Sequence, residues 1–180
     1  MIASPESLPR LDPEAYLDYE REQSLRHELV DGYLYAMTGS SDRHEEIALN
    51  LAASLRVHLR GSSCRVYKGD LKLRVADDFY YPDVFVRCGV DRGDAYFKTD
   101  PVLIAEVLSP STQRYDRGDK RLAYFRLPSL REYLLISQDR MFVEVHDVRR
   151  PGQALRLEQP GDVLTLESVD FPMALAELYE

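Results

Sequence analysis

One run of eight residues, residues 101–108, restricts the possible folds of this chain more than any other feature. It reads Pro-Val-Leu-Ile-Ala-Glu-Val-Leu and is apolar at both alternating sets of positions, which is typical of a β-strand covered on both faces. The one charged residue in it is Glu106. An ionised carboxylate in a dry interior must be neutralised, paired or bound to a cation. Glu106 therefore indicates either a structural ion pair with a nearby arginine or a functional site.

A second carboxylate, Asp83, lies in another strand-like run, residues 81–88. Two carboxylates on neighbouring interior strands would supply oxygen ligands for a divalent cation, and the backbone carbonyl of Val107 would add another. Because the chain has no cluster of histidine and cysteine with zinc-type spacing, these hard oxygen ligands favour Mg²⁺ or Mn²⁺. The alternative for Asp83, which follows Pro82, is an ordinary residue at the start or edge of a strand.

Lys120 is the candidate for the positive group that phosphodiester chemistry needs beside two carboxylates. Residues 116–127 have a helical pattern, with Asp116 as the expected cap. This places Lys120 in the first turn or so of a helix near the carboxyl end of the Glu106 strand, where ligands collect in α/β sheets. Tyr124, four residues later, shares its face. The alternative is a simple Asp116–Lys120 pair on the helix, worth about 0.3 kcal/mol.

The remaining pattern predicts a mixed α/β (α+β) domain. Asp12 and Pro13 form a good helix start, and the Asp31-Gly32 pair predicts a tight hairpin turn. Residues 1–11 are expected to form a loose leader, and residues 12–180 a single domain with a central sheet. The expected helices are 12–24, 40–60 and 116–127, and a final amphipathic segment covers 173–179. The expected strands are 26–30, 33–38, 65–67, 71–75, 81–88, 102–108, 132–137 and 141–148, with weaker ones near Leu155 and Leu164.

The net charge of −8 argues against a protein that binds nucleic acid by bulk electrostatics. Basic residues are nevertheless concentrated in two segments, residues 56–74 and residues 114–126. The first contains a single acid, Asp70, whereas Asp116 and Asp119 dilute the second. Each cluster is either a contact surface for nucleic acid or an ordinary solvated face.

Cys64 and Cys88 are the two cysteines of the chain. Their spacing fits no zinc site, and we expect two free thiols in a reducing cytoplasm, with a disulfide as the less favoured alternative. Apolar runs fall far short of the roughly 20 residues that a membrane helix needs, and the N-terminus lacks the features of a secretory signal. The expected location is therefore the cytoplasm, without membrane association.

Several motifs together resemble the Uma-two family, which is assigned to the restriction-endonuclease-like, PD-(D/E)xK superfamily. The resemblance extends over about residues 12–178, and its most specific part is Glu-Val-Leu-Ser-Pro-Ser-Thr with the Asp, Lys and Tyr that follow it. The matching positions are Arg-His-Glu-Leu-Val-Asp-Gly (26–32), His44, Tyr-Pro-Asp (81–83), Glu-Val-Leu-Ser-Pro-Ser-Thr (106–112), Asp116, Lys120, Tyr124 and Glu-Tyr-Leu-Leu-Ile (132–136).

The resemblance implies a restriction-endonuclease-like core, a central mixed β-sheet flanked by helices, with the metal-binding acids on adjacent strands. By this match Asp83 and Glu106 are those acids. The superfamily expects a lysine two residues after the second acid, but Leu108 stands there, and in this family Lys120 takes its role from the next helix. Glu28 matches an upstream glutamate that would add a metal ligand or position a water; the alternative is a residue on the open face of the hairpin.

His44 also matches the family, and a helix-capping or core role is expected for it. The predicted function is that of a Mg²⁺- or Mn²⁺-dependent endonuclease acting on nucleic acid, with DNA as the expected substrate. A homodimer is expected because nucleases of this type often pair to cut two strands. One alternative is an inactive module of nuclease fold that binds DNA or protein, and another is a structural homodimer whose Glu106 is only ion-paired. The expected contacts to the nucleic-acid backbone are Arg65, Lys68, Lys72, Arg114 and Arg117.

Overall fold

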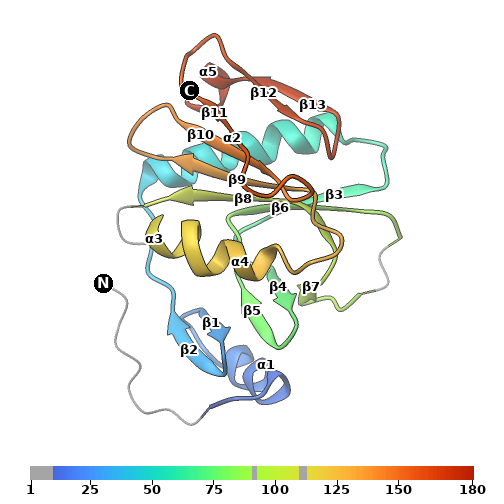
Figure 1. The fold of residues 1–180 in the computed structure, drawn as a ribbon. Coiled ribbons are helices and arrows are strands. Elements are labelled where there is room, and N and C mark those ends of the chain that lie inside the picture. Colours follow the sequence, from blue (N-terminus) through green and yellow to red (C-terminus); the bar gives the residue numbers. More distant parts are fainter. Residues whose placement is uncertain (1–9, 91–92, 110–112) are drawn as a thin grey trace.

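A six-stranded mixed sheet forms the centre of the fold (Figure 1). The computed structural model describes residues 10–90, 93–109 and 113–180, so most of the predicted leader lies outside the described residues. In the order β11-β10-β9-β8-β6-β3, the neighbours β8 and β9 are parallel and all other pairs are antiparallel. The predicted central mixed sheet is thus confirmed. Its strands are β3 (Cys64–Lys68), β6 (Val84–Cys88), β8 (Pro101–Leu108), β9 (Glu132–Ser137), β10 (Val143–Asp147) and β11 (Ala154–Leu157).

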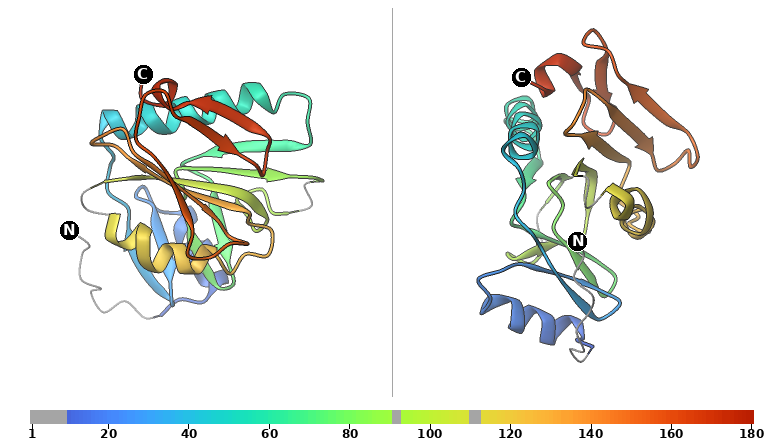
Figure 2. Two further views of the ribbon diagram at one scale, coloured as in Figure 1. Left: turned by 45° about the horizontal axis from the view of Figure 1, so that its top comes forward. Right: turned by 90° about the vertical axis from the view of Figure 1, so that its left-hand side faces the viewer.

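Strand β8 is buried on both faces, as its apolar pattern predicts. Helix α2 (Asp42–His58) covers one face of the sheet, and the helical segment of α3 (Gln113–Tyr115), η1 (Asp116–Lys120) and α4 (Arg121–Tyr124) covers the other (Figures 1 and 2). Ala105 and Val107 belong to the core on the α2 side. Since side chains alternate along a strand, Glu106 lies on the opposite face, toward α4.

A second sheet of five strands, in the order β2-β1-β5-β4-β7, carries helix α1 (Pro13–Arg21). Tyr16 of α1 packs against Phe79 with ring centroids 4.9 Å apart. The predicted hairpin is present, and Asp31 and Gly32 have φ angles of 51° and 82°, the left-handed values that a tight two-residue turn requires. The strands are β1 (His27–Val30), β2 (Tyr33–Ala36), β4 (Lys72–Val75), β5 (Asp78–Tyr80) and β7 (Phe97–Lys98).

Two helix starts follow directly from the sequence. The Asp12 carboxylate accepts a hydrogen bond of 2.8 Å from the Ala15 N–H at the start of α1, and the Ser41 hydroxyl accepts one of 3.2 Å from the His44 N–H at the start of α2. These caps satisfy N–H groups that have no partner within the helix. On α2, the aliphatic residues Ile47, Leu51 and Leu55 recur every four residues and are buried against the six-stranded sheet.

Two boundaries predicted from the sequence are wrong. The strand predicted at 81–88 starts only at Val84, as β6 of the first sheet, and the preceding strand β5 ends at Tyr80 in the second sheet. Pro82, between the two strands, lacks an N–H for a ladder. Asp116 does not cap a helix, because the helical segment already begins at Gln113 and Asp116 is buried within it. The short strands β7 and β13 (Phe171–Ala174) were not predicted.

The C-terminal segment completes the α2 side of the core. Strand β12 (Val163–Leu166) pairs with β13, and the short helix α5 (Leu175–Leu178) follows. Leu164 and Leu178 are fully buried there together with residues of α2. Among the described residues, no helix combines the length and the apolar character that crossing a membrane requires.

The expectation of two free thiols is wrong, because Cys64 and Cys88 form a disulfide. The cause is the strand register: β3 and β6 are antiparallel neighbours, and Cys64 lies directly opposite Cys88. A separation of 24 residues in the sequence carries no signal of this pairing. The two cysteines therefore do not support the expected reducing compartment.

We expect the free energy of unfolding to fall in acid because of His146 on β10. Its ring packs near Phe125 and Tyr133, and its Nε2 atom is buried without a hydrogen bond among the described residues. Burial, reinforced by Arg121, Arg117 and Arg156, lowers the pKa of His146 to about 4. The unfolded chain therefore takes up this proton first, and stability falls as the pH drops from about 7 toward 4.

We expect the His146→Leu variant to lack this loss. Wild type should lose about 1 to 2 kcal/mol more than the variant between pH 7 and pH 4.5, allowing for the partial exposure of the ring. Urea unfolding of both proteins at the two pH values measures the difference. Equal losses in the two proteins would show that His146 is not held in its neutral form.

Candidate active site

The buried charge at Glu106 is explained by a direct ion pair with Lys120. The ammonium of Lys120 lies 3.0 Å from Glu106 Oε1, and the hydroxyl of Tyr124 donates a hydrogen bond of 2.9 Å to the same oxygen. Both partners come from the helical segment that follows β8, as predicted from the spacing. The predicted alternative of an arginine partner for Glu106 finds no support among the described residues.

Leu108 does not leave a gap in the site. Its side chain is buried in the core cluster with Ile104 and Tyr124, and Lys120 delivers the ammonium to Glu106 from the opposite layer. A lysine borne by the helix thus reaches the carboxylate on β8, which is the arrangement that the family resemblance implies.

Two further carboxylates surround the same ammonium. Glu28 Oε1 lies 3.1 Å from Lys120 Nζ and also accepts a hydrogen bond of 3.0 Å from the Tyr81 N–H. Asp116 Oδ1 lies 3.9 Å from Lys120 Nζ. Glu28 is therefore not on an open face of the hairpin but inside the site. The Asp116–Lys120 pair exists as well, as one of three contacts of the lysine rather than the only one.

Asp83 is held beside Glu106 by hydrogen bonds that involve the backbone N–H groups of Asp83 and Val107. Its own N–H donates to Glu106 Oε2 at 3.2 Å, and its Oδ2 atom accepts a hydrogen bond of 2.7 Å from the Val107 N–H. This follows from the register of β6 and β8, in which Val84 lies opposite Ala105. The sequence prediction that the two acids occupy neighbouring interior strands is thus supported, although Asp83 immediately precedes β6.

His44 contacts the site in a way that the sequence did not indicate. Its Nε2 atom lies 3.2 Å from Asp83 Oδ2, whereas its Nδ1 atom is buried without a hydrogen-bond partner among the described residues. Burial lowers the pKa of His44, but a hydrogen bond to Asp83, the charge of Asp83 and a hydrogen bond to the backbone of Val107 outweigh it, so the pKa is raised. The available signals were its place in the first turn of α2 and its match to the family motif.

The electrostatics of the cluster are unbalanced toward negative charge. Burial raises the pKa of Glu106 well above its ordinary value against the opposing effect of Lys120, and the charges of Asp83, Asp116 and Glu28 add to the rise. Burial alone would lower the pKa of Lys120, but Glu106 and Glu28 raise it well above its ordinary value. The lysine is therefore charged, and one ammonium faces more carboxylates than it can neutralise.

The four carboxylates differ in their access to solvent. The side chain of Asp83 is 23% exposed, whereas those of Glu28, Glu106 and Asp116 are 9%, 3% and 5% exposed. A cation or substrate would therefore approach from the Asp83 side. Within the described ranges, no group of three or more His, Cys, Asp or Glu side chains is arranged closely enough to hold a metal ion by itself.

The five basic residues expected to contact nucleic acid lie in different surroundings. Lys68 is near Asp83, because the neighbouring Gly69 N–H donates to the Asp83 carbonyl at 3.0 Å, and its ammonium pairs with Glu45. Arg65 bends back onto the carbonyls of Ser62 and Cys64.

The other three basic residues, Lys72, Arg114 and Arg117, differ in their contacts. Lys72 lies over the ring of Tyr81, Arg114 is exposed, and Arg117 pairs with the buried Glu144. Lys68 thus lies beside Asp83, Arg117 is directed toward Glu144, and Arg65 is turned away.

Residues 13–176 match the family Uma2, described as "Putative restriction endonuclease". The chain belongs to the Uma2 family. Two Synechocystis proteins are similar along most of their length: the "Uncharacterized protein slr1290" is 40% identical over 175 residues, 95% of this chain and 92% of the relative. The "Uncharacterized protein sll1609" is 30% identical over 157 residues, 84% of this chain and 89% of the relative.

A solved structure shares the fold of this Uma2 chain. It is described as the crystal structure of "a putative nuclease belonging to DUF820" from Anabaena variabilis and superposes with a TM-score of 0.79, covering 94% of this chain and 97% of that one. At 16% identity the likeness concerns the fold alone. The restriction-endonuclease-like core expected from the sequence is therefore confirmed for this Uma2 member.

Proposed function

We propose that this Uma2 protein is a Mg²⁺- or Mn²⁺-dependent endonuclease that hydrolyses phosphodiester bonds of nucleic acid, with DNA as the substrate. The observation that carries the proposal is the 3.0 Å contact between Lys120 and Glu106, on the carboxylate that also accepts a hydrogen bond from Asp83. Three residues from three separate segments meet at one point. Their types are those that metal-assisted phosphodiester hydrolysis requires.

The donor atoms present fit Mg²⁺ or Mn²⁺. Asp83 Oδ1 accepts no hydrogen bond from the described residues, and Glu106 Oε2 accepts only one, from the Asp83 N–H. Mg²⁺ needs only one or two carboxylates from the protein and keeps several waters, so two acids suffice. The excess of negative charge around Lys120 would favour a bound cation. Asp83 and Glu106 would hold it, with the Val107 carbonyl as the further predicted ligand.

A bound divalent ion would supply Lewis-acid stabilisation of negative charge on the reacting phosphate. The protein's own residues fix the geometry around it. Tyr124 and Lys120 together hold Glu106 Oε1, and Glu28 holds Lys120 from the other side. An ammonium has three N–H donors, and these two carboxylates take two. Since Asp116 Oδ1 at 3.9 Å is beyond hydrogen-bond length, the third would be available to orient the attacking water or to contact the phosphate.

Mn²⁺ is expected to stabilise the wild-type protein against heat. At a concentration about 100 times the Kd, a bound ion adds about 2.7 kcal/mol, which raises the Tm of a chain of this size by about 5 to 10 °C. Asp83→Ala and Glu106→Gln should abolish the shift because each removes a ligand. Thermal unfolding at millimolar Mn²⁺ measures it.

The matched control for this test is Asp77→Asn, which removes one carboxylate from an exposed turn (83% exposed side chain). Its Mn²⁺ shift should equal that of wild type. No shift in wild type would reject the metal site. A shift that persists in both Asp83→Ala and Glu106→Gln would place the ion elsewhere on the molecule.

Two further expectations stay predictions. A homodimer would place two such sites against the two strands of a duplex, and sedimentation of the purified chain tests it. The cytoplasmic location also stays a prediction, and fractionation of the native host tests it. If the protein binds Mn²⁺ and DNA but cleaves nothing, the inactive binding module becomes the better description.

A further inference from the structure

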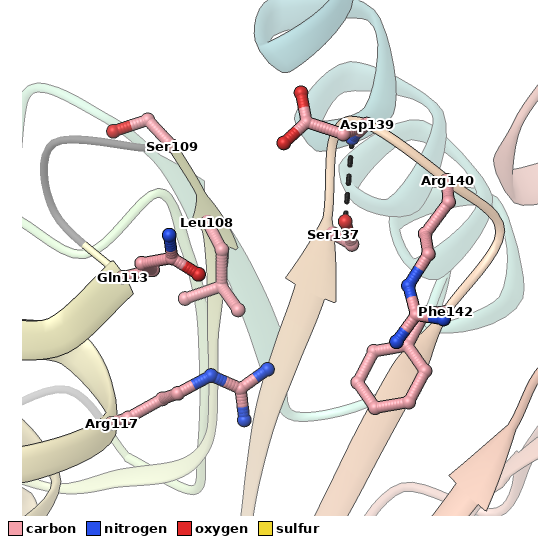
Figure 3. Close-up of a pocket in the computed structure, with 8 residues that line it drawn as sticks. All are labelled: Leu108, Ser109, Gln113, Arg117, Ser137, Asp139, Arg140 and Phe142. Atoms are coloured by element: carbon pink, nitrogen blue, oxygen red, sulfur yellow. Dashed lines mark hydrogen bonds between the residues drawn. The ribbon is translucent and has the colours of Figure 1, made fainter.

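A pocket of about 270 Å³ opens at the carboxyl ends of β8 and β9, next to the candidate active site (Figure 3). It belongs to neither the acid cluster nor the predicted basic stretch of residues 56–74. Three parts of the chain form its walls: the end of β8, the helical segment, and the turn between β9 and β10. The lining residues that matter are Leu108, Gln113, Arg117, Ser137, Arg140 and Phe142.

Phe142 positions two guanidinium groups from different elements. The Arg140 guanidinium lies over the ring at 4.5 Å from its centroid, and that of Arg117 lies 5.9 Å from it. Phe142 itself is buried, with 6% of its surface exposed. The ring is thus a support for two arginines rather than a free face for stacking a base. Figure 3 shows the two arginines extending into the pocket from opposite sides.

Positive charge is in excess around this pocket. Glu144 is the acid that faces Arg117, and it is shared with Arg156, whose Nε lies 3.2 Å from Glu144 Oε1. Arg140 has no hydrogen bond or ion pair to the described residues beyond its contact with Phe142. Burial, together with the charges of Arg156, Arg121 and Arg140, lowers the pKa of Arg117.

The one acid on the rim does not cancel this charge. Asp139 lines the pocket, but Figure 3 shows its carboxylate directed away from both guanidiniums. Ser137 and Gln113 add neutral side chains that can donate hydrogen bonds. The pocket therefore offers donors and positive charge, which suit an anion with several oxygens.

The position of the pocket connects it to the acid cluster. Leu108 follows Glu106 by two residues on the same face of β8, a rise of about 7 Å. Arg117 precedes Lys120 by three residues in the same helical turn. A nucleic-acid strand carries one phosphate per 3.4 Å of helix axis. A phosphate in the pocket would thus lie within about two nucleotides of a bond held at Glu106.

We propose that this pocket binds a backbone phosphate of the substrate strand, one or two nucleotides from the scissile bond, through Arg117 and Arg140. The inference rests on the proposed function for its substrate. Guanidinium groups match the geometry of phosphate oxygens. Contact with a phosphate next to the reacting one would fix the register of the strand without reading its sequence.

Binding of a fluorescein-labelled DNA oligonucleotide in EDTA, where no cleavage occurs, tests the pocket separately from the chemistry. Arg140→Ala is the main variant because the side chain has no polar partner whose loss would disturb folding. We expect its Kd to rise about 10-fold or more and the slope of log K against log salt to fall by about 0.7 to 0.9. Arg117→Ala should act in the same direction.

Arg149→Ala is the matched control, because it removes the same charge from an exposed position at the far end of β10; its Kd should change less than 2-fold. Equal Kd values for wild type and Arg140→Ala, or no binding by wild type, would overturn the pocket. Tight binding of inorganic phosphate without oligonucleotide binding would also overturn it in favour of a small-anion site. If the protein cleaves DNA and Arg140→Ala leaves the Kd for DNA unchanged, the proposed nuclease function stands and only the proposed role of this pocket is rejected.

Discussion

Lys120→Met is expected to lower the free energy of unfolding by about 3 to 5 kcal/mol at pH 7. The ammonium lies 3.0 Å from Glu106 and 3.1 Å from Glu28. Both carboxylates are buried, so removing the ammonium takes away the cation that these two charges face. Methionine keeps most of the volume, and the loss therefore reports charge rather than packing. Urea unfolding at pH 7 measures it.

The effect of Lys120→Met should shrink in acid. Without the lysine, the buried carboxylates hold protons more tightly in the folded than in the unfolded state, so the stability of the variant rises relative to wild type as the pH falls from 7 to 4.5. The control is Lys68→Met, whose ammonium is paired with Glu45 but 30% exposed. It should cost less than about 1 kcal/mol. Equal losses for both variants would show that Lys120 is not the centre of the cluster.

Glu106→Gln is expected to abolish cleavage while leaving the fold intact. The change removes one metal ligand and the charge that faces Lys120, and a loss of at least about 100-fold in rate follows if the ion carries the chemistry. The glutamine retains an oxygen that can accept the hydrogen bond from Tyr124. Lys120 retains Glu28 as a partner.

The rate constant for DNA cleavage at saturating Mg²⁺ measures the loss, with circular dichroism and thermal unfolding as checks on the fold. Asp77→Asn again serves as the control, since its carboxylate lies in an exposed turn. A variant that keeps its rate within about 3-fold of wild type would remove Glu106 from the site. A variant that fails to fold would be replaced by Asp83→Asn, whose side chain is more exposed.

Local chemistry predicted much of the fold. Strand β8, the Asp31-Gly32 hairpin and the Asp12 cap of α1 each follow from a few adjacent residues, because a periodic apolar pattern or a capping side chain acts over one turn or one strand. The pairing of Glu106 with a helix-borne lysine could also be predicted, since the helix follows its strand directly.

The parts that could not be predicted depend on register between distant segments. Glu28 is buried against Lys120 only because the hairpin packs under the helical segment. His44 reaches Asp83 only because α2 starts beside the beginning of β6. Cys64 opposes Cys88 only through the β3–β6 register. No local pattern encodes these contacts, and each arises when separate elements pack together.

The central claim is that Asp83, Glu106 and Lys120 form a metal-dependent phosphodiesterase site. Nicking of supercoiled plasmid tests it most directly, with wild type and Asp83→Asn purified in parallel and incubated with and without Mg²⁺ or Mn²⁺. The predicted result is conversion to open-circular or linear DNA by wild type with metal only, reduced at least about 100-fold in Asp83→Asn. Metal-independent nicking, or equal nicking by both proteins, would contradict the claim.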